Sequence, residues 1–376
     1  IGEVTENLDN LRKPLNSIQR SSISKKKLYP YYGANNLIDY VDEYIFDEEI
    51  LCVAEDGGSW GYKEKCTYIV NEKCWVNNHA HVLRAKDNLN IAYLSYYLNY
   101  NDLNSHITGT TRGKLTKSAL SNIEILLPEL EKQNIIVEIL DKAQELIDRR
   151  KEQIAMLDEL VKSQFIEMFG DKDKYTYIKI EQLVSNKSDI VDGPFGSNLK
   201  TVDYVDDGVR VIQINNIGES NFRDKNKKYI TEEKYKSLLK HSVVPGDIVV
   251  AKMGEPIGRA CILPDYISKA VIVADCMKIR PNLAIINRKY LEFLLNTEEV
   301  KAQFRKYSQG STRVRLNLTM LRQIKVLYPP IELQNQFADF VKQVDKLKFE
   351  MEKSLKELED NFNSLMQKAF KGELFN

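Results

Sequence analysis

The sequence lacks the motifs with which a chain binds a nucleotide or a dinucleotide cofactor. No P-loop is present and no Gly-x-Gly-x-x-Gly follows a strand-like run, so neither kind of phosphate cradle is expected. Asp-Pro-Pro-Tyr and Asn-Pro-Pro-Tyr, the signature of amino methyltransferases that act on DNA, are also absent. Only four histidines occur, and none has an obvious Ser or Cys partner for nucleophilic catalysis. These absences argue against a stand-alone enzyme.

The chain also lacks a net charge and a long apolar run. Its 54 Lys and Arg residues balance 54 Asp and Glu residues, which argues against a protein that coats nucleic acid but allows a local basic patch. No run approaches the roughly 20 apolar residues of a membrane helix, and no secretory signal stands at the start. The sequence begins at Ile1, so we expect a few residues to precede it. We expect a cytoplasmic protein.

Cysteine is scarce, with five residues scattered along the chain. An odd number spread in this way suits a reducing compartment. Cys66, Cys74, His79 and His81 are close enough in sequence to raise the question of zinc, but their spacing is not that of a known ligand knuckle. We therefore expect buried or surface thiols and no metal.

One stretch of the sequence occurs twice. Its copies run over residues 123–169 and 324–370, and corresponding positions such as Pro128 and Pro329 lie 201 residues apart. Each copy has a Gln-Asn pair near its start and a long helical pattern after it. A constant interval over this length indicates internal duplication. The segments before the two copies also correspond, so the predicted order is globular domain, helix, globular domain, helix.

Both copies carry an apolar seam with alternating steps of three and four residues, the spacing of helices that wind around each other. The first helix, expected from about residue 131 to 169, is a rod about 60 Å long at 1.5 Å per residue. The seams hold the same register, so the simplest partner of each helix is the other one. Two ordinary amphipathic surface helices are the alternative. The seam positions are Leu140, Ile147, Ile154, Leu157, Val161, Val341, Val344, Met351, Leu355, Leu358 and Phe362.

Each globular domain is predicted to be rich in β-structure, because short apolar runs alternate with Gly, Asn and Asp turn signals. In the first domain we expect strands at residues 44–46, 50–54, 67–70 and 80–83. In the second domain we expect them at residues 209–214, 247–251 and 271–274. A glycine-bearing loop follows the same strand in both domains, at Gly57 and at Gly254.

Polar and aromatic residues gather in the predicted loops. Arg and Lys bind phosphates or guanine edges, Asn pairs with adenine, and Gly permits close backbone approach. Aromatic residues beside Gly are also often local packing, and a loop Arg can instead satisfy loop carbonyls. The candidate DNA contacts of the first domain are Tyr31, Tyr32, Gly33, Asn35, Asn36, Gly58, Ser59, Trp60, Lys63, Arg112 and Lys114. Those of the second are Phe195, Gly196, Ser197, Asn198, Lys200, Lys252, Glu255, Arg259, Arg313 and Arg315.

Two similar domains on a pair of antiparallel helices are related by a pseudo-twofold axis, and they face the same direction. A duplex with two recognition sites matches such an arrangement, because protein symmetry mirrors half-site spacing. The domains are similar but not identical, so we expect them to read different sequences. The expected ligand is double-stranded DNA with a split, asymmetric target.

These features resemble the specificity subunit of type I restriction–modification systems. The phrases that carry the resemblance are Tyr-Pro-Tyr-Tyr-Gly-Ala-Asn at 29–35, Gly-Pro-Phe-Gly-Ser-Asn-Leu-Lys at 193–200, Pro-Gly-Asp-Ile at 245–248 and Gly-Ser-Thr-Arg at 310–313. Each is weak alone, but they occur in order over essentially the full length. The first domain departs from the pattern, with Gly-Thr-Thr-Arg at 109–112 and no Gly-Pro-Phe-Gly phrase.

Together with the apolar seam of the two helices, the resemblance implies an α+β fold. Its two β-rich target-recognition domains are residues 1–127 and 171–328. A long spacer helix follows each, at residues 128–170 and 329–376, and the two helices pair as an antiparallel coiled coil. The resemblance implies a non-catalytic subunit without a cofactor of its own. Two modification subunits, which methylate adenine, hold S-adenosylmethionine and dock on the helices. A restriction subunit with ATP and Mg joins some such complexes. A stand-alone DNA-modifying enzyme and a coiled-coil adaptor are the alternatives.

Overall fold

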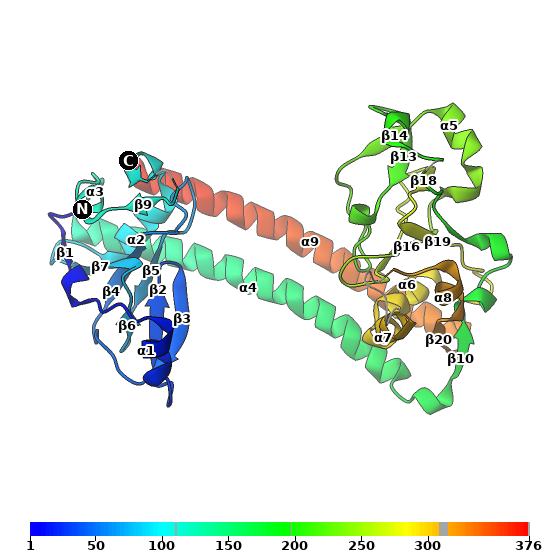
Figure 1. The fold of residues 1–376 in the computed structure, drawn as a ribbon, viewed down its shortest axis with the longest axis horizontal. Helices are drawn as coiled ribbons and strands as arrows, with labels where there is room; N and C mark the ends of the chain where they lie inside the picture. Colours follow the sequence, from blue (N-terminus) through cyan, green and yellow to red (C-terminus); the bar gives the residue numbers. More distant parts are fainter. Residues whose placement is uncertain (110, 197, 308–314, 375–376) are drawn as a thin grey trace. The chain divides into compact units, whose positions relative to one another are not determined.

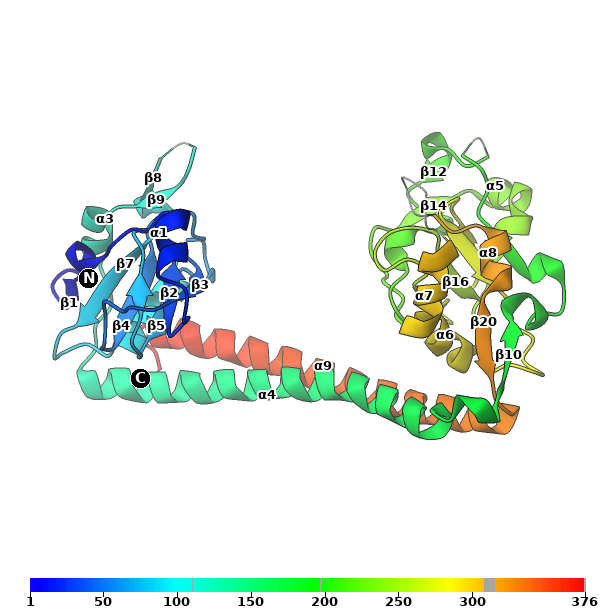
Figure 2. The ribbon, with the colours of Figure 1, turned by 60° about the horizontal axis from the view of Figure 1, so that its bottom comes forward.

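The computed structural model describes residues 1–109, 111–196, 198–307 and 315–374. They form two compact units (Figures 1 and 2). The first unit joins residues 1–154 to residues 350–376, and the second contains residues 155–349. The compact units therefore do not coincide with continuous halves of the sequence, because each unit includes part of both long helices.

The first unit is built on a four-stranded antiparallel sheet. Its strands, in spatial order, are β1 (Thr5–Asn7), β7 (Ala80–Ala85), β4 (Ile50–Ala54) and β5 (Thr67–Val70). A smaller sheet has the order β3 (Asn36–Val41), β2 (Tyr29–Gly33) and β6 (Trp75–Val76). The remaining elements are α1 (Ser17–Ser22), α2 (Ile91–Tyr100), α3 (Lys117–Ser121), and the hairpin of β8 (Ile107–Thr108) and β9 (Lys114–Leu115).

The second unit repeats this plan on a larger scale. Its four-stranded sheet has the order β11 (Ile190–Asp192), β19 (Cys276–Ile279), β16 (Ile248–Ala251) and β17 (Ala260–Ile262). A five-stranded sheet has the order β12 (Tyr204–Val205), β14 (Lys228–Ile230), β13 (Val209–Ile212), β18 (Ala270–Ile272) and β15 (Ser242–Val243). The other elements are β10 (Thr176–Lys179), β20 (Lys325–Tyr328), α5 (Glu232–Ser237), α6 (Arg288–Asn296), α7 (Glu298–Tyr307) and α8 (Leu318–Gln323).

The predicted strands are observed with one exception. Residues 44–46 form no strand, and only Phe46 takes part in an isolated bridge, with Cys74. Residues 29–36 were expected to form a loop. They form strand β2 and a tight turn that leads into β3. The β2 residues from Pro30 to Gly33 are buried, since the strand lies between β3 and β6.

The two long helices are α4 (Leu130–Phe169) and α9 (Ile331–Phe370). In the first unit, the start of α4 shares a core with the end of α9, through Leu140 and Met366. In the second unit, the end of α4 shares a core with the start of α9, through Phe165 and Phe337. The helices are therefore antiparallel, which confirms the predicted coiled coil.

Ion pairs between α4 and α9 agree with the antiparallel arrangement. Lys151 lies 3.0 Å from Glu359 in the first unit, and Lys348 lies 2.7 Å from Asp158 in the second. Helix α4 ends at Phe169, and the Gly170 amide makes its last backbone bond, to the Ile166 carbonyl at 2.7 Å. A Cβ on Gly170 would stand only 2.4 Å from that oxygen, so the chain needs a glycine where it leaves the helix. None of the helices in the described ranges combines the length and apolar character that crossing a membrane requires.

A repeated glutamine fastens each long helix to its own domain. The Gln133 side chain is buried, accepts the Asn90 amide at 2.9 Å, and donates to the Pro128 carbonyl at 2.8 Å. Gln334 makes the same contacts with Asn287 and Pro329, at 2.9 Å and 2.8 Å. The repeated Gln-Asn pair is thus a structural anchor that joins the start of a long helix to the cap of α2 or α6.

Candidate nucleic-acid interface

In both domains, a backbone hydrogen bond joins two of the three segments predicted to contact DNA. In the first, the amide of Leu115, the last residue of β9, donates to the Glu55 carbonyl at 2.8 Å. In the second, the Leu316 amide donates to the Lys252 carbonyl, also at 2.8 Å. The loop after β4 or β16 is therefore joined to the segment that carries the Thr-Arg or Ser-Thr-Arg phrase. We call this junction the paired-loop surface; in the second domain its described residues are the loop after β16 together with Arg315 and Leu316.

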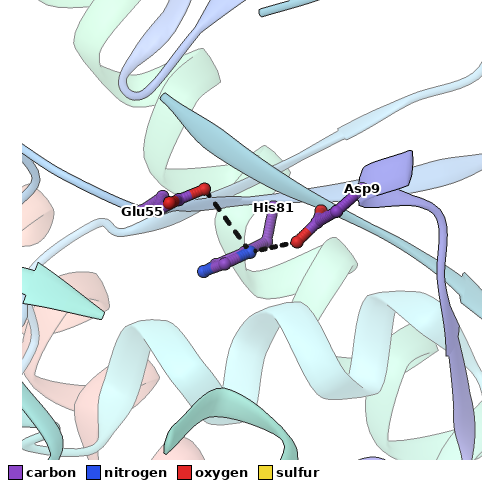
Figure 3. A group of neighbouring side chains, drawn as sticks. All are labelled: Asp9, Glu55 and His81. Atoms are coloured by element: carbon purple, nitrogen blue, oxygen red, sulfur yellow. Dashed lines mark hydrogen bonds and ion pairs between the residues drawn. The ribbon is translucent and has the colours of Figure 1, made fainter. Parts of the chain in front are cut away.

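A group of charged side chains holds the paired loops of the first domain in place (Figure 3). The His81 ring donates through Nδ1 to Asp9, at 2.6 Å, and through Nε2 to the Leu115 carbonyl, at 2.8 Å. Arg12 bridges Asp9 and Glu55, at 3.3 Å from an Asp9 oxygen and 2.7 Å from a Glu55 oxygen. His81 is almost fully buried, so these contacts fix the base of the hairpin.

The group raises the question of a metal ion. Asp9, Glu55 and His81 each offer one ligand atom, and these atoms lie within 4.8 Å of one another. Both carboxylates are already paired with cations, however, because Arg12 contacts both and Lys114 lies 2.9 Å from Glu55. Both nitrogens of the His81 ring are also used in hydrogen bonds. The arrangement therefore fits an ion-pair cluster better than a metal centre.

The cysteine and histidine residues considered for zinc do not form one group. Cys66 and Cys74 are buried free thiols, and burial raises the pKa of each to about 12. Zinc binds the thiolate form, so this environment opposes a zinc site. His79 contacts Asp56 instead, at 2.9 Å. These contacts agree with the expectation of buried thiols.

Several predicted contacts of the first domain are exposed. Arg112 lies on the hairpin with 64% of its side chain exposed and is paired with Asp56 at 2.7 Å. Asn35 lies in the turn between β2 and β3, Asn36 begins β3, and the Asn35 amide donates to the Gly57 carbonyl at 3.1 Å. Lys63 lies 5.0 Å from the Tyr62 ring centre. The exposed candidates of this domain are Asn35, Asn36, Ser59, Lys63, Arg112 and Lys114.

The aromatic candidates of the first domain are core residues. Tyr31 is 1% exposed and packs with Val41 and Trp75. Tyr32 is buried, and its hydroxyl bonds to Glu72. Trp60 is buried and donates from its indole nitrogen to the Ala54 carbonyl at 3.2 Å. The prediction that these rings pack against nucleotides is wrong for this conformation, because the apolar rings are more stable in the core.

Glycines of the first domain lie beside this core. Gly33 is buried at the end of β2, and Gly58 is half-buried. A Cβ on Gly58 would stand 2.5 Å from the Ala54 side chain. Its lack of a side chain is therefore required by local packing.

The second domain exposes the loop after β11. Phe195 is 78% exposed, an unusual position for a large apolar ring that no neighbour covers. Gly196, Asn198 and Lys200 in the same loop are also exposed. Ser197 and Arg313 lie outside the described residues.

The charged candidates near β16 are mostly engaged with the protein itself. Lys252 is buried and pairs with Asp192 at 3.1 Å. Arg259 donates to four backbone carbonyls, the closest that of Ile217 at 2.7 Å. Arg259 is thus the loop-capping arginine of the alternative interpretation. Glu255 is exposed. Arg315 is also exposed and pairs with Asp275 at 2.8 Å.

The seam of the two helices is shielded along its length. Leu140, Ile147, Leu157, Val341 and Val344 are buried. The other seam positions are half-buried, namely Ile154, Val161, Met351, Leu355, Leu358 and Phe362. The alternative of two separate surface helices is therefore wrong.

Sequence reasoning missed the residues that position the interface. Asp9 and Arg12 come from one segment and His81 from another, far along the chain, so the group carries no spacing signal. Their roles follow only once β7 brings His81 beside the segment after β1. The Gln-Asn repeat was visible in the sequence, but its partners Asn90 and Asn287 were not.

Comparison with known proteins identifies the family. The model of the type I restriction modification DNA specificity domain matches residues 1–158 and 169–360. The chain is 24% identical over 373 residues to the MjaVIII specificity subunit of Methanocaldococcus jannaschii, covering 92% of this chain and 86% of that protein. It is 39% identical over 141 residues to the putative specificity subunit S.HindORF215P of Haemophilus influenzae, a match that spans 38% of this chain and 35% of the relative.

Solved structures show the same fold. The S subunit of a type I restriction–modification system from M. genitalium superposes with a TM-score of 0.59 at 15% identity, covering 97% of this chain and 95% of that chain. A chain from a study of the assembly and conformational transition of the type I system gives a TM-score of 0.54 at 16% identity, covering 99% and 97%. The chain belongs to the family of type I restriction–modification DNA specificity subunits.

Proposed function

We propose that each domain reads one half of a bipartite target in double-stranded DNA. The observation that carries this proposal is the paired-loop surface, which is built on the same sheet order in both domains and presents different side chains in each. Arg112 is exposed on this surface in the first domain, and Phe195 is exposed in the loop after β11 of the second domain. Unlike surfaces on like scaffolds favour an asymmetric target.

The antiparallel helices set the distance between the half-sites and provide the docking surface for two modification subunits. The chain itself is non-catalytic and binds no cofactor in this proposal. S-adenosylmethionine belongs to the modification subunits, and ATP and Mg belong to a restriction subunit where one is present. The net charge of zero is consistent with partner subunits that hold part of the DNA backbone.

The test is a methylation assay with the partner modification subunit and a library of random-sequence duplexes. We expect one bipartite motif among the methylated products, with a fixed spacer. Methylation without sequence preference contradicts the proposal. Binding of S-adenosylmethionine by the isolated chain would instead favour a stand-alone enzyme.

A further inference from the structure

The two domains join the same pair of strands in different ways. In the first domain, β2 and β3 are joined by Ala34 and Asn35 alone. In the second domain, the equivalent strands β13 and β14 are joined by residues 213–227. The strand pairs correspond because each is antiparallel and each first strand pairs in parallel with a third strand, β6 or β18. The long segment and Lys228, residues 213–228, are called the basic connection below.

Both connections are tied to the glycine-bearing loop. The Asn35 amide of the first domain donates to the Gly57 carbonyl at 3.1 Å. In the second domain, Arg259 donates to the carbonyls of Ile214 and Ile217, at 3.1 Å and 2.7 Å. The basic connection therefore begins beside the predicted contact loop, where the first domain has its Asn35–Asn36 turn.

Buried polar side chains hold the backbone of the basic connection. Asn216 is fully buried, and its amide donates to the carbonyls of Arg223 and Lys225 at 2.9 Å and 2.7 Å. Arg210, which is 7% exposed, pairs with Asp224 at 3.2 Å. These bonds fix the segment in one conformation, because a buried polar group that loses its partner is costly. The segment is thus a built surface feature.

The basic connection carries cations that the protein does not neutralise. Its two acids are already paired, Glu219 with Lys301 and Asp224 with Arg210 and Lys227. In the parts of the chain that the structure describes, no acid forms an ion pair with Arg223, Lys225 or Lys228, and all three residues are exposed. The first domain has no Lys or Arg in residues 34–46.

The charge of Arg223 also acts on the guanidinium of Arg259 in the contact loop. Burial, and after it the charge of Arg223, lower the pKa of Arg259. Like charges repel each other, and an anion beside them relieves that repulsion. The surface next to the contact loop is therefore suited to a phosphate.

We propose that the basic connection binds backbone phosphates of the duplex beside the half-site read by the second domain, through Arg223, Lys225 and Lys228. The inference rests on the proposed function. The first domain lacks this segment, so this contact is made by the second domain. Phosphate contacts position a protein without reading bases, and each one adds about one to the salt dependence of affinity.

The experiment compares Lys225→Ala/Lys228→Ala with the wild-type chain, each assembled with the modification subunit. The affinity for the cognate duplex is measured across a range of salt concentrations. We expect the slope of log affinity against log salt to fall by about two, because two phosphate contacts are lost. The methylated consensus should remain the same.

The matched control is Lys187→Ala/Lys325→Ala, which removes two exposed lysines of the same unit. Its slope should equal that of the wild type, and thermal melts should show that both variants are folded. A Lys225/Lys228 slope equal to the control overturns the inference, as does a changed second half-site. A wild-type complex without any sequence preference contradicts the proposed function itself, and with it this inference.

Discussion

The ring of Phe370 at the end of α9 packs edge-on against the ring of Tyr93 in the first domain, with centroids 5.5 Å apart. Phe169 at the end of α4 makes the equivalent contact with Tyr290 in the second domain, at 5.3 Å. Each long helix thus begins at its own domain and ends against the other. The last turn of α9 is part of the core of the first unit.

Phe370→Ala should destabilise the first unit, because truncating a buried Phe typically costs about 3 kcal/mol or more. We expect a lower melting temperature and faster proteolysis within residues 1–154. Phe349→Ala is the control, since this ring is largely exposed and its loss should cost less than about 0.5 kcal/mol. Equal stability of the two variants would show that the terminal turn does not contribute to the core.

Gln133→Ala should loosen the junction between α4 and the first domain. The substitution leaves the Asn90 amide and the Pro128 carbonyl without their partner, and an unsatisfied buried group costs about 1–3 kcal/mol. Urea denaturation of the variant measures the loss. The exposed Gln367 provides the control substitution, which should leave the midpoint unchanged.

The antiparallel pairing can be tested by zero-length cross-linking. A carbodiimide should join Lys348 to Asp158, because the Lys348 Nζ lies 2.7 Å from a carboxylate oxygen. Peptide mass spectrometry after digestion detects the product. Lys348→Arg keeps the charge but removes the reactive amine, so the cross-link should disappear. A cross-link from Lys348 to residues near the start of α4 would contradict the observed direction.

Asp9 should make stability depend on acid pH. Burial raises the pKa of Asp9, but the hydrogen bonds from His81 and the Val82 amide and the charge of Arg12 outweigh it, so the net pKa lies below the ordinary 3.8. A carboxyl whose pKa is lowered by folding stabilises the fold at pH values above its ordinary pKa. That stability is lost as the pH falls through the folded-state pKa.

Asp9→Asn should therefore be less stable than the wild type at pH 7 and should show a weaker dependence on pH below about 4. Denaturation at a series of pH values checks both expectations. Asp87→Asn gives a control carboxyl in an exposed turn. A variant that keeps the full wild-type pH profile would exclude Asp9 as its source.

Shortening both helices by one heptad should change the spacer of the DNA target. Removing residues 144–150 and the facing residues 357–363 keeps the seam in register and shortens the pair by about 10 Å. That length corresponds to about three base pairs. We expect the methylated motif to keep both half-sites and lose about three spacer positions. New half-site sequences would contradict the proposal that the domains read the bases and the helices set only the spacing.

Periodicity in the sequence was sufficient to predict the helices. The seam from Leu140 to Val161 and its repeat from Val341 to Phe362 are shielded along their length, because a 3.5-residue period places all of them on one face. The strands at residues 50–54 and 67–70 also followed from their apolar runs. These are local patterns, and they need no knowledge of distant residues.

The DNA-facing surface was predicted less well. Tyr31 and Trp60 were assigned to loops from their composition, but β3 and β6 cover the first, and the loop folds the second against Ala54. Arg259 is a strong phosphate candidate by residue type, yet four carbonyls use its guanidinium. Whether a side chain faces solvent depends on its neighbours in space, and those are not its neighbours in sequence.

The sequence by itself determined the duplication, the order of the elements and the pairing of the helices, because each is written as a repeat or a period along the chain. Only the tertiary structure decided that His81, Arg12 and Asp9 hold the paired loops of the first domain. It alone also decided that residues 213–228, a segment without a counterpart in the first domain, expose their cations. Burial and ion pairing assign those roles, since both depend on which strands come together when the chain folds.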